Sequence, residues 1–203
     1  MTPQPIVTPG KLTVYCGPMY AGKTSVLIAE LDEALSEQQT VLVVKPSIDN
    51  RYKEDDIVSH DGISLKETTN HPVLCLNVED VIPEEQLDSL NTLFVDEAQF
   101  FTTLVKEQVP QLLERGVDVV VVGLDLDSEG NPFGSMPFLL SLADRVIKMT
   151  STCAVCGYDA HRTFRKLTAK SSSQVLIGGA ETYEARCFKH WVEGRAERQR
   201  WMA

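Results

Sequence analysis

The sequence of 203 residues lacks any apolar run that approaches the length of a membrane span. Its first ten residues, MTPQPIVTPG, lack the basic and apolar regions of a signal peptide, and their three prolines predict a flexible tail over residues 1–10. Internal repeats and low-complexity tracts are also missing. These absences exclude membrane insertion and predict a cytoplasmic protein with no membrane partner, while a hydrophobic content of 43% excludes disorder throughout the chain.

Positive charge is scarce, with 19 Lys and Arg against 29 Asp and Glu, for a formal net charge of −10. Such a balance argues against nonspecific binding to nucleic acid or to an anionic membrane. The charge is uneven, because residues 1–150 hold 10 basic and 24 acidic residues, whereas residues 151–203 hold 9 and 5. We therefore expect a main domain over residues 11–150 and a separate small module over residues 151–203.

Cysteines are few and odd in number, five in all, which favours free thiols or metal ligands over disulfides. Two pairs of candidate ligands have two residues between their members, a spacing typical of structural zinc sites: Cys153 with Cys156, and Cys187 with His190. Four protein ligands leave no open position, so the metal would stabilise the module and take no part in catalysis. The alternative is a set of reduced cysteines and a surface histidine. Cys16 and Cys75 lie in apolar runs and are expected to be core thiols.

Continuous apolar runs alternate with helical patterns through the first 150 residues. Strands of this composition are covered on both faces, so the pattern predicts an α/β fold with a mainly parallel sheet flanked by helices. The expected strands are 11–16, 40–45, 92–96, 117–125 and 145–150, and the expected helices are 23–37, 78–89 and 103–114. Ligands in such sheets bind at the carboxyl ends of the strands.

The stretch GPMYAGKT, residues 17–24, follows the first strand and precedes the first helix. Glycines allow successive backbone N–H groups to turn toward phosphate oxygens, while Lys23 would neutralise charge and the Thr24 hydroxyl could bind Mg²⁺. The helix N-terminus adds its dipole to the same anion. A chance match in an ordinary loop is the alternative, but the order of strand, loop and helix indicates a P-loop NTPase-type fold.

The stretch TLFVDEAQFF places two carboxylates, Asp96 and Glu97, at the end of an apolar strand. An acid at this position beside a phosphate loop can hold Mg²⁺, directly or through water, and the next carboxylate can then face the reacting atoms. A solvated acidic turn is the alternative interpretation.

The segment between Cys156 and Cys187 has strand-like ends around a polar, serine-rich middle. A loop that is fixed at its base by metal and free at its tip is suited to close over a small substrate. A loop without a function is the alternative.

The motifs GPMYAGKT, KPSIDNRY, DEAQFF, GLDLD followed by NPFG, the zinc ligands and IGGAETY resemble, in this order, those of the type II thymidine kinases. The resemblance covers nearly the whole chain after residue 11. It implies transfer of the γ-phosphate of ATP to the 5′-hydroxyl of thymidine, which gives dTMP in nucleotide salvage for DNA synthesis. It also implies Mg²⁺ as catalytic cofactor, structural Zn²⁺, a homotetramer, and dTTP as feedback inhibitor.

The resemblance also assigns roles to individual residues. Glu97 would be the catalytic base, and Asp96 would help to place Mg²⁺. The ATP side would comprise Gly17, Pro18, Met19, Tyr20, Ala21, Gly22, Lys23, Thr24, Asp49, Arg51, Asp96, Ala98 and Gln99. The thymidine side would comprise Phe100, Leu124, Thr163, Leu176, Ile177, Gly178 and Tyr183, with backbone groups of a lasso loop binding the base edge.

Two positions depart from the pattern of many animal members of this family. His190 stands where they have a fourth cysteine, and Ser128 stands where they have an aromatic residue in the pocket wall. Histidine still suits zinc, whereas the serine leaves the fine specificity of the pocket open.

Two other functions compete with this interpretation. A nucleoside monophosphate kinase with a zinc-bound lid would need a basic grip on a second phosphate, yet the lasso segment holds mostly Ser, Gly and apolar residues around KLTAK. A nucleic-acid-binding ATPase could use DEAQ as a helicase-like motif and the basic module as a contact surface, but a helicase usually needs a second motor lobe. We therefore expect no nucleic-acid partner.

Overall fold

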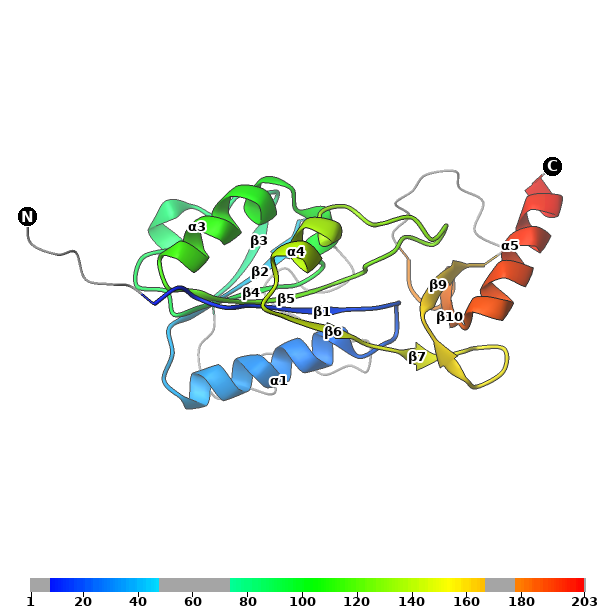
Figure 1. Ribbon diagram of the computed structural model, residues 1–203, viewed down its shortest axis with the longest axis horizontal. Helices are drawn as coiled ribbons and strands as arrows, with labels where there is room; N and C mark the ends of the chain where they lie inside the picture. The colour runs from blue at the N-terminus through cyan, green and yellow to red at the C-terminus, as the bar shows by residue number, and fades with distance from the viewer. Residues whose placement is uncertain (1–7, 48–73, 167–177, 203) are drawn as a thin grey trace, which may run out of the picture.

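A six-stranded parallel sheet forms the centre of the computed structural model, which describes residues 8–47, 74–166 and 178–202 (Figure 1). The strand order is β3-β2-β4-β5-β1-β6, and every neighbouring pair is parallel. The bounds are β1 Leu12–Cys16, β2 Val41–Pro46, β3 Leu74–Val78, β4 Thr92–Val95, β5 Asp118–Gly123 and β6 Arg145–Lys148. The parallel arrangement brings the carboxyl ends of all these strands to one edge.

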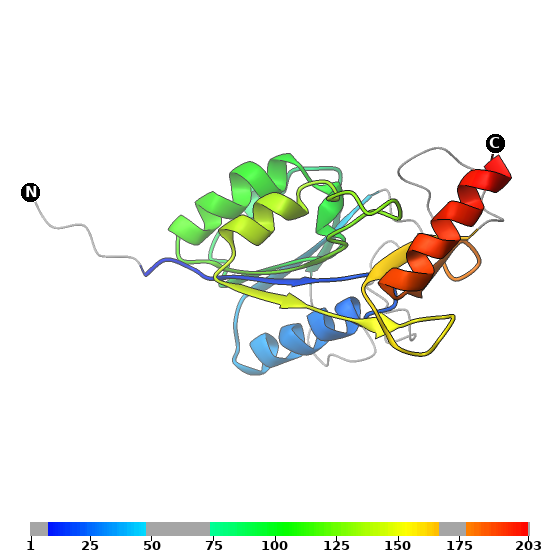
Figure 2. The ribbon, with the colours of Figure 1, turned by 45° about the vertical axis from the view of Figure 1, so that its right-hand side comes forward.

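Helices cover both faces of the sheet, as the continuous apolar strands require. Helix α1 (Lys23–Ser36) lies on one face, and α3 (Val109–Glu114) and α4 (Met136–Leu142) lie on the other (Figures 1 and 2). Each face of the sheet has its own hydrophobic core, and alternate residues of a strand point into one or the other. Phe94 packs with α1, whereas Val95 packs with the opposite layer. The predicted α/β fold with a parallel sheet flanked by helices is confirmed.

The predicted helix over residues 78–89 is wrong. Val78 is the last residue of strand β3. Between residues 78 and 89 the only helical turn is the short 3₁₀ segment Glu84–Gln86. The backbone of Ile82 is instead bound by a buried side chain, because Gln108 accepts its N–H at 2.9 Å and donates to its carbonyl at 2.8 Å. Tertiary hydrogen bonds thus replace the helical ones, and Pro83 has no N–H to donate.

Three further elements differ from the expectation. The predicted helix over 103–114 is divided into a π-helical segment, Leu104–Gln108, and α3. Strand β3 and helix α4 were not among the predicted elements. The carboxylate of Asp80 explains where the π-helical segment begins, because it accepts the N–H groups of Thr102 and Thr103 at 2.5 and 2.9 Å.

The C-terminal part of the chain lies beyond the carboxyl ends of the sheet (Figure 1). It contains two small antiparallel sheets and a helix: β7 (Ser151–Thr152) with β8 (Asp159–Ala160), β9 (Arg162–Arg165) with β10 (Tyr183–Arg186), and α5 (Phe188–Met202). No helix within the described ranges has the length and apolar character that a membrane crossing requires.

Candidate active site

The loop between β1 and α1 has a backbone that glycine makes possible. Gly17 has a φ of 146°, and a Cβ there would lie 2.4 Å from the carbonyl oxygen of Met149 on the neighbouring chain segment. Gly22 has a φ of 78° and immediately precedes α1. Both positions favour glycine because side chains rarely adopt positive φ. The loop therefore has the strand, turn and helix start that a phosphate cradle needs.

The ammonium group of Lys23 lies in the curve of this loop, where its Nζ donates to the carbonyl oxygen of Pro18 at 2.6 Å. Burial lowers the pKa of Lys23, and the carboxylates of Glu97, Asp96 and Asp125 oppose this effect. The amine is thus close enough to the acidic ends of β4 and β5 to interact with them electrostatically.

The two predicted carboxylates form a tight turn directly after β4. Asp96 is buried, and its Oδ1 accepts the N–H of Glu97 at 2.9 Å. Glu97 has a φ of 49°, a left-handed conformation that is uncommon for a residue with a side chain. Its Oε2 accepts a hydrogen bond from Gln99 Nε2 at 2.5 Å. The turn therefore fixes both carboxylates beside the phosphate-binding loop.

The predicted nucleoside contacts Phe100 and Leu124 follow β4 and β5 at the same edge of the sheet. The ring of Phe100 packs edge to face against that of Phe133, with centroids 5.6 Å apart. Phe133 is a contact that the sequence analysis did not single out, although it lies within the NPFG motif. Its backbone N–H donates to the Asp125 carbonyl at 3.1 Å, which closes the loop between them.

Hydrogen bonds connect the phosphate-binding loop to the C-terminal strands. The N–H of Met19 donates to Thr163 Oγ1 at 3.0 Å, and the Tyr20 hydroxyl donates to the Tyr183 carbonyl at 3.4 Å. Ser151 Oγ donates to the Tyr20 carbonyl at 2.9 Å. Predicted residues of the ATP side and of the thymidine side are thereby brought into direct contact.

We expect Thr163→Val to destabilise the chain by about 1–3 kcal/mol, because the partly buried N–H of Met19 loses its acceptor while the side-chain volume is kept. Thr163 is 4% exposed, so water cannot easily replace the hydroxyl. Thr163→Ser, which retains the oxygen, is the matched control. Urea unfolding measures the difference, and equal stability of the two variants would show that this bond contributes nothing.

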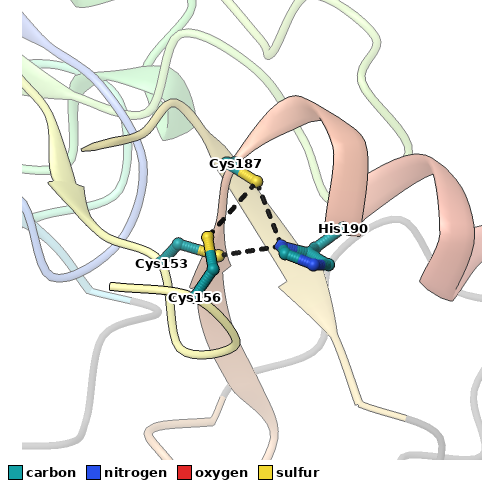
Figure 3. Close-up of side chains that lie close together, drawn as sticks. All are labelled: Cys153, Cys156, Cys187 and His190. Carbon is teal, nitrogen blue, oxygen red and sulfur yellow. Dashed lines mark hydrogen bonds between the residues drawn. The ribbon is translucent and has the colours of Figure 1, made fainter. Parts of the chain in front are cut away.

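Four candidate metal ligands converge from the β7–β8 turn, the end of β10 and the first turn of α5 (Figure 3). Their ligand atoms all lie within 4.8 Å of one another: Cys153, Cys156, Cys187 and His190. The Nδ1 of His190 lies 3.2 Å from Cys187 Sγ and 3.6 Å from Cys153 Sγ. Three thiols and one imidazole nitrogen facing a common point suit zinc.

The environment of Cys153 favours the thiolate that a metal requires. Burial alone would raise its pKa, but backbone N–H groups of Cys187, Val155 and Cys156, together with the His190 ring, lower the pKa to about 6. By contrast Cys16 lies in the main core, as predicted, and burial raises its pKa. The side chain of Cys75 lies outside the described residues.

The loop that contains Ser128 is fixed by helix α5. The indole N–H of Trp191 donates to the Ser128 carbonyl at 3.1 Å, and its ring lies so close to Gly130 that a Cβ there would be 2.7 Å away. Arg195 forms an ion pair with Glu129 at 3.2 Å. The position that departs from the family pattern therefore contributes its backbone to a contact between the two parts of the chain.

Some predicted site residues cannot be placed in this geometry. Asp49, Arg51, Leu176 and Ile177 lie outside the described residues. Gly178 is described, and a Cβ there would lie 2.3 Å from Thr182 Oγ1. The side chain of Ala98 is fully buried in the core, so only its backbone could contact a nucleotide.

Comparison with known proteins agrees with this geometry. A family model described as thymidine kinase matches residues 10–191. The chain belongs to the thymidine kinase family. A thymidine kinase of the onion yellows phytoplasma, strain OY-M, is 40% identical over 186 residues, which cover 89% of this chain and 86% of that protein. A thymidine kinase of Bacteroides thetaiotaomicron is 37% identical over 191 residues, which cover 93% and 90%. The family predicted from the motifs is confirmed.

Proposed function

We propose that this member of the thymidine kinase family transfers the γ-phosphate of ATP to the 5′-hydroxyl of thymidine, giving dTMP and ADP. One observation carries the proposal: a glycine-dependent loop between β1 and α1 curves around the Lys23 amine, and the Asp96–Glu97 turn follows β4 at the same edge of the sheet. A P-loop beside an acidic strand end is an arrangement that recurs in enzymes of phosphoryl transfer.

The proposed ATP side is the loop itself. Backbone N–H groups of Gly17–Thr24 would bind the phosphates together with the dipole of α1, except that Pro18 has no N–H and the N–H of Met19 donates to Thr163. Lys23 would neutralise the charge on the transferred group. Asp96 and the Thr24 hydroxyl offer the oxygen ligands that suit Mg²⁺, which when bound neutralises phosphate charge. Asp49 and Arg51 complete this side of the proposal on the strength of the motif alone.

The proposed base is Glu97. Phosphoryl transfer needs alignment and charge neutralisation more than covalent help, so a carboxylate that accepts the 5′-hydroxyl proton is sufficient. Its left-handed backbone and its bond to Gln99 hold this carboxylate in one place. The hydroxyl oxygen would then attack the γ-phosphorus as the bond to the ADP oxygen breaks.

The proposed thymidine side lies between the main sheet and the C-terminal strands. Phe100 and Leu124, which follow β4 and β5, would contribute from the sheet, and Thr163 and Tyr183 would contribute from β9 and β10. Gly178, with Leu176 and Ile177, would supply backbone groups to the base edge. Homotetramer formation and inhibition by dTTP are further proposals that rest on the family.

Zinc is the structural metal that the cluster in residues 151–203 fits, with Cys153, Cys156, Cys187 and His190 as its ligands. These ligands come from segments far apart in the sequence, so a bound metal would join the β7–β8 turn to α5. It would thereby hold in place the strands that contact Met19 and Tyr20.

We expect Cys153→Ser to reduce the zinc content from about one ion per chain to a small fraction and to loosen the C-terminal module, because a closed four-ligand site loses one thiolate. Cys16→Ala is the matched control, since it removes a buried thiol outside the cluster. Metal analysis and limited proteolysis test this. Full zinc occupancy in Cys153→Ser would remove that residue as a ligand.

The test of the proposed function is a comparison of phosphate acceptors. With ATP and Mg²⁺, we expect thymidine to be phosphorylated efficiently and dTMP not at all, with deoxyuridine and deoxycytidine defining the breadth of the pocket. A preference for dTMP would favour a monophosphate kinase. ATP hydrolysis stimulated by single-stranded DNA, with salt-dependent binding, would favour the nucleic-acid ATPase.

A further inference from the structure

A buried glutamine joins the ends of β4 and β5 within the site. Gln99 is 4% exposed. Its Nε2 donates to Glu97 Oε2 at 2.5 Å, and its Oε1 accepts the N–H of Leu124 at 2.9 Å. One amide group therefore contacts both the proposed base and the backbone of a proposed nucleoside contact.

The orientation of this amide follows from its partners. The backbone N–H of Leu124 can only donate, so the atom that faces it must be Oε1, the oxygen of the Gln99 side-chain amide. The NH₂ group then faces Glu97, where it requires an acceptor. The Gln99 amide thus presents a donor to Oε2 of Glu97 and fixes the position of that carboxyl group.

Close packing limits any movement of Gln99. Gly134 has a φ of 50°, and a Cβ there would lie 1.8 Å from the backbone carbonyl oxygen of Gln99. At Gly123 a Cβ would lie 2.8 Å from Gln99 Oε1 and 2.7 Å from the sulfur of Met136. Glycines at both positions allow the chain to close around this residue.

We propose that Gln99 is a positioning residue, which aligns the Glu97 side chain with the backbone of Leu124, a proposed nucleoside contact, and does not itself contact ATP. The proposal rests on the proposed function of Glu97, and it replaces the expectation from the family motif that Gln99 belongs to the ATP side. Because one rigid amide holds both groups, the distance between the base and the bound nucleoside is set from within the fold.

The decisive variant is Gln99→Glu. It keeps the size of the side chain and an oxygen for the Leu124 N–H, but it places a second carboxyl group against Glu97. Two carboxylates at this distance repel each other, so the pair retains one shared proton. While that proton is bound, residue 97 cannot accept the proton of the 5′-hydroxyl. We expect the acid limb of the kcat profile to move upward by at least about one pH unit, which lowers kcat by about tenfold or more at a pH below the acid limbs of both enzymes.

A matched control is available in Gln108→Glu. Gln108 is also a buried glutamine whose amide forms two hydrogen bonds, both to Ile82 and away from the carboxylate pair. This change should reduce stability and leave the pH profile of kcat in place. A purely structural role for Gln99 would make the two variants alike.

Stability provides a second readout that does not depend on turnover. The double variant Glu97→Gln with Gln99→Glu restores one amide and one carboxylate. We therefore expect its loss of unfolding free energy at neutral pH to be smaller than the sum of the losses in the two single variants, while its activity stays low. If the changes in unfolding free energy were additive, or if Gln99→Glu were active with an unshifted pH profile of kcat, the positioning role would be overturned. The proposed function would still stand. A wild-type chain that fails to phosphorylate thymidine would instead reject the proposed function and the role that rests on it.

Discussion

Glu97→Gln should lower kcat for thymidine phosphorylation by about 10²- to 10⁴-fold, the range typical of a lost general base. The amide keeps the size of the side chain but cannot accept the 5′-hydroxyl proton. Binding of ATP and thymidine should change little, because the charge that holds the phosphates comes from the loop and from Lys23. Steady-state rates together with the two dissociation constants test this.

Asp96→Asn is the matched comparison, since it makes the same chemical change one residue earlier. If Asp96 helps to place Mg²⁺, its loss should raise the Mg²⁺ concentration needed for half-maximal rate as well as lower turnover. Glu97→Gln should leave that Mg²⁺ concentration unchanged. A Glu97→Gln enzyme within a few-fold of wild type would remove Glu97 as the base.

Lys23→Met should lower kcat by about 10²- to 10³-fold, the cost typical of removing one group that stabilises developing charge. Methionine retains the length of the side chain and most of its packing, so the loss isolates the ammonium and its bond to the Pro18 carbonyl. Thymidine affinity should be preserved, since no phosphate is involved in that step. Turnover measured at saturating ATP and thymidine provides the test.

Lys106→Ala serves as the control for Lys23, because it removes an exposed lysine from the π-helical segment. It should leave turnover and both affinities unchanged. A Lys23→Met enzyme with the turnover of the Lys106→Ala variant would contradict the assignment of the loop lysine to the transferred phosphate.

The parallel sheet and the metal cluster could be predicted because their signals are local. Apolar runs such as 117–125 are buried on both faces, and ligand pairs such as Cys187 and His190 have a fixed spacing. Prediction from the sequence failed where contacts between distant residues determine the backbone conformation. Residues 78–89 have helical character, yet Gln108 binds the Ile82 backbone from another element and prevents a helix.

The same distinction applies to the site. Lys23, Asp96 and Glu97 were predicted from motifs whose spacing reflects their chemistry. Gln99 was placed with ATP because the motif contains it, and only its hydrogen bonds to Glu97 and Leu124 indicate another role. Phe133 and Trp191 act through contacts with Phe100 and with the Ser128 carbonyl. Such pairings depend on folding, so no local pattern marks them.

The most direct test of the account follows the terminal phosphate itself. Wild-type protein is incubated with Mg²⁺, thymidine and ATP labelled in the γ-phosphate, and the products are separated by chromatography. We expect the label in dTMP, at the 5′ position, with one ADP formed for each dTMP. Release of the label as inorganic phosphate without dTMP, or its appearance in dTDP only after dTMP is supplied, would contradict the account.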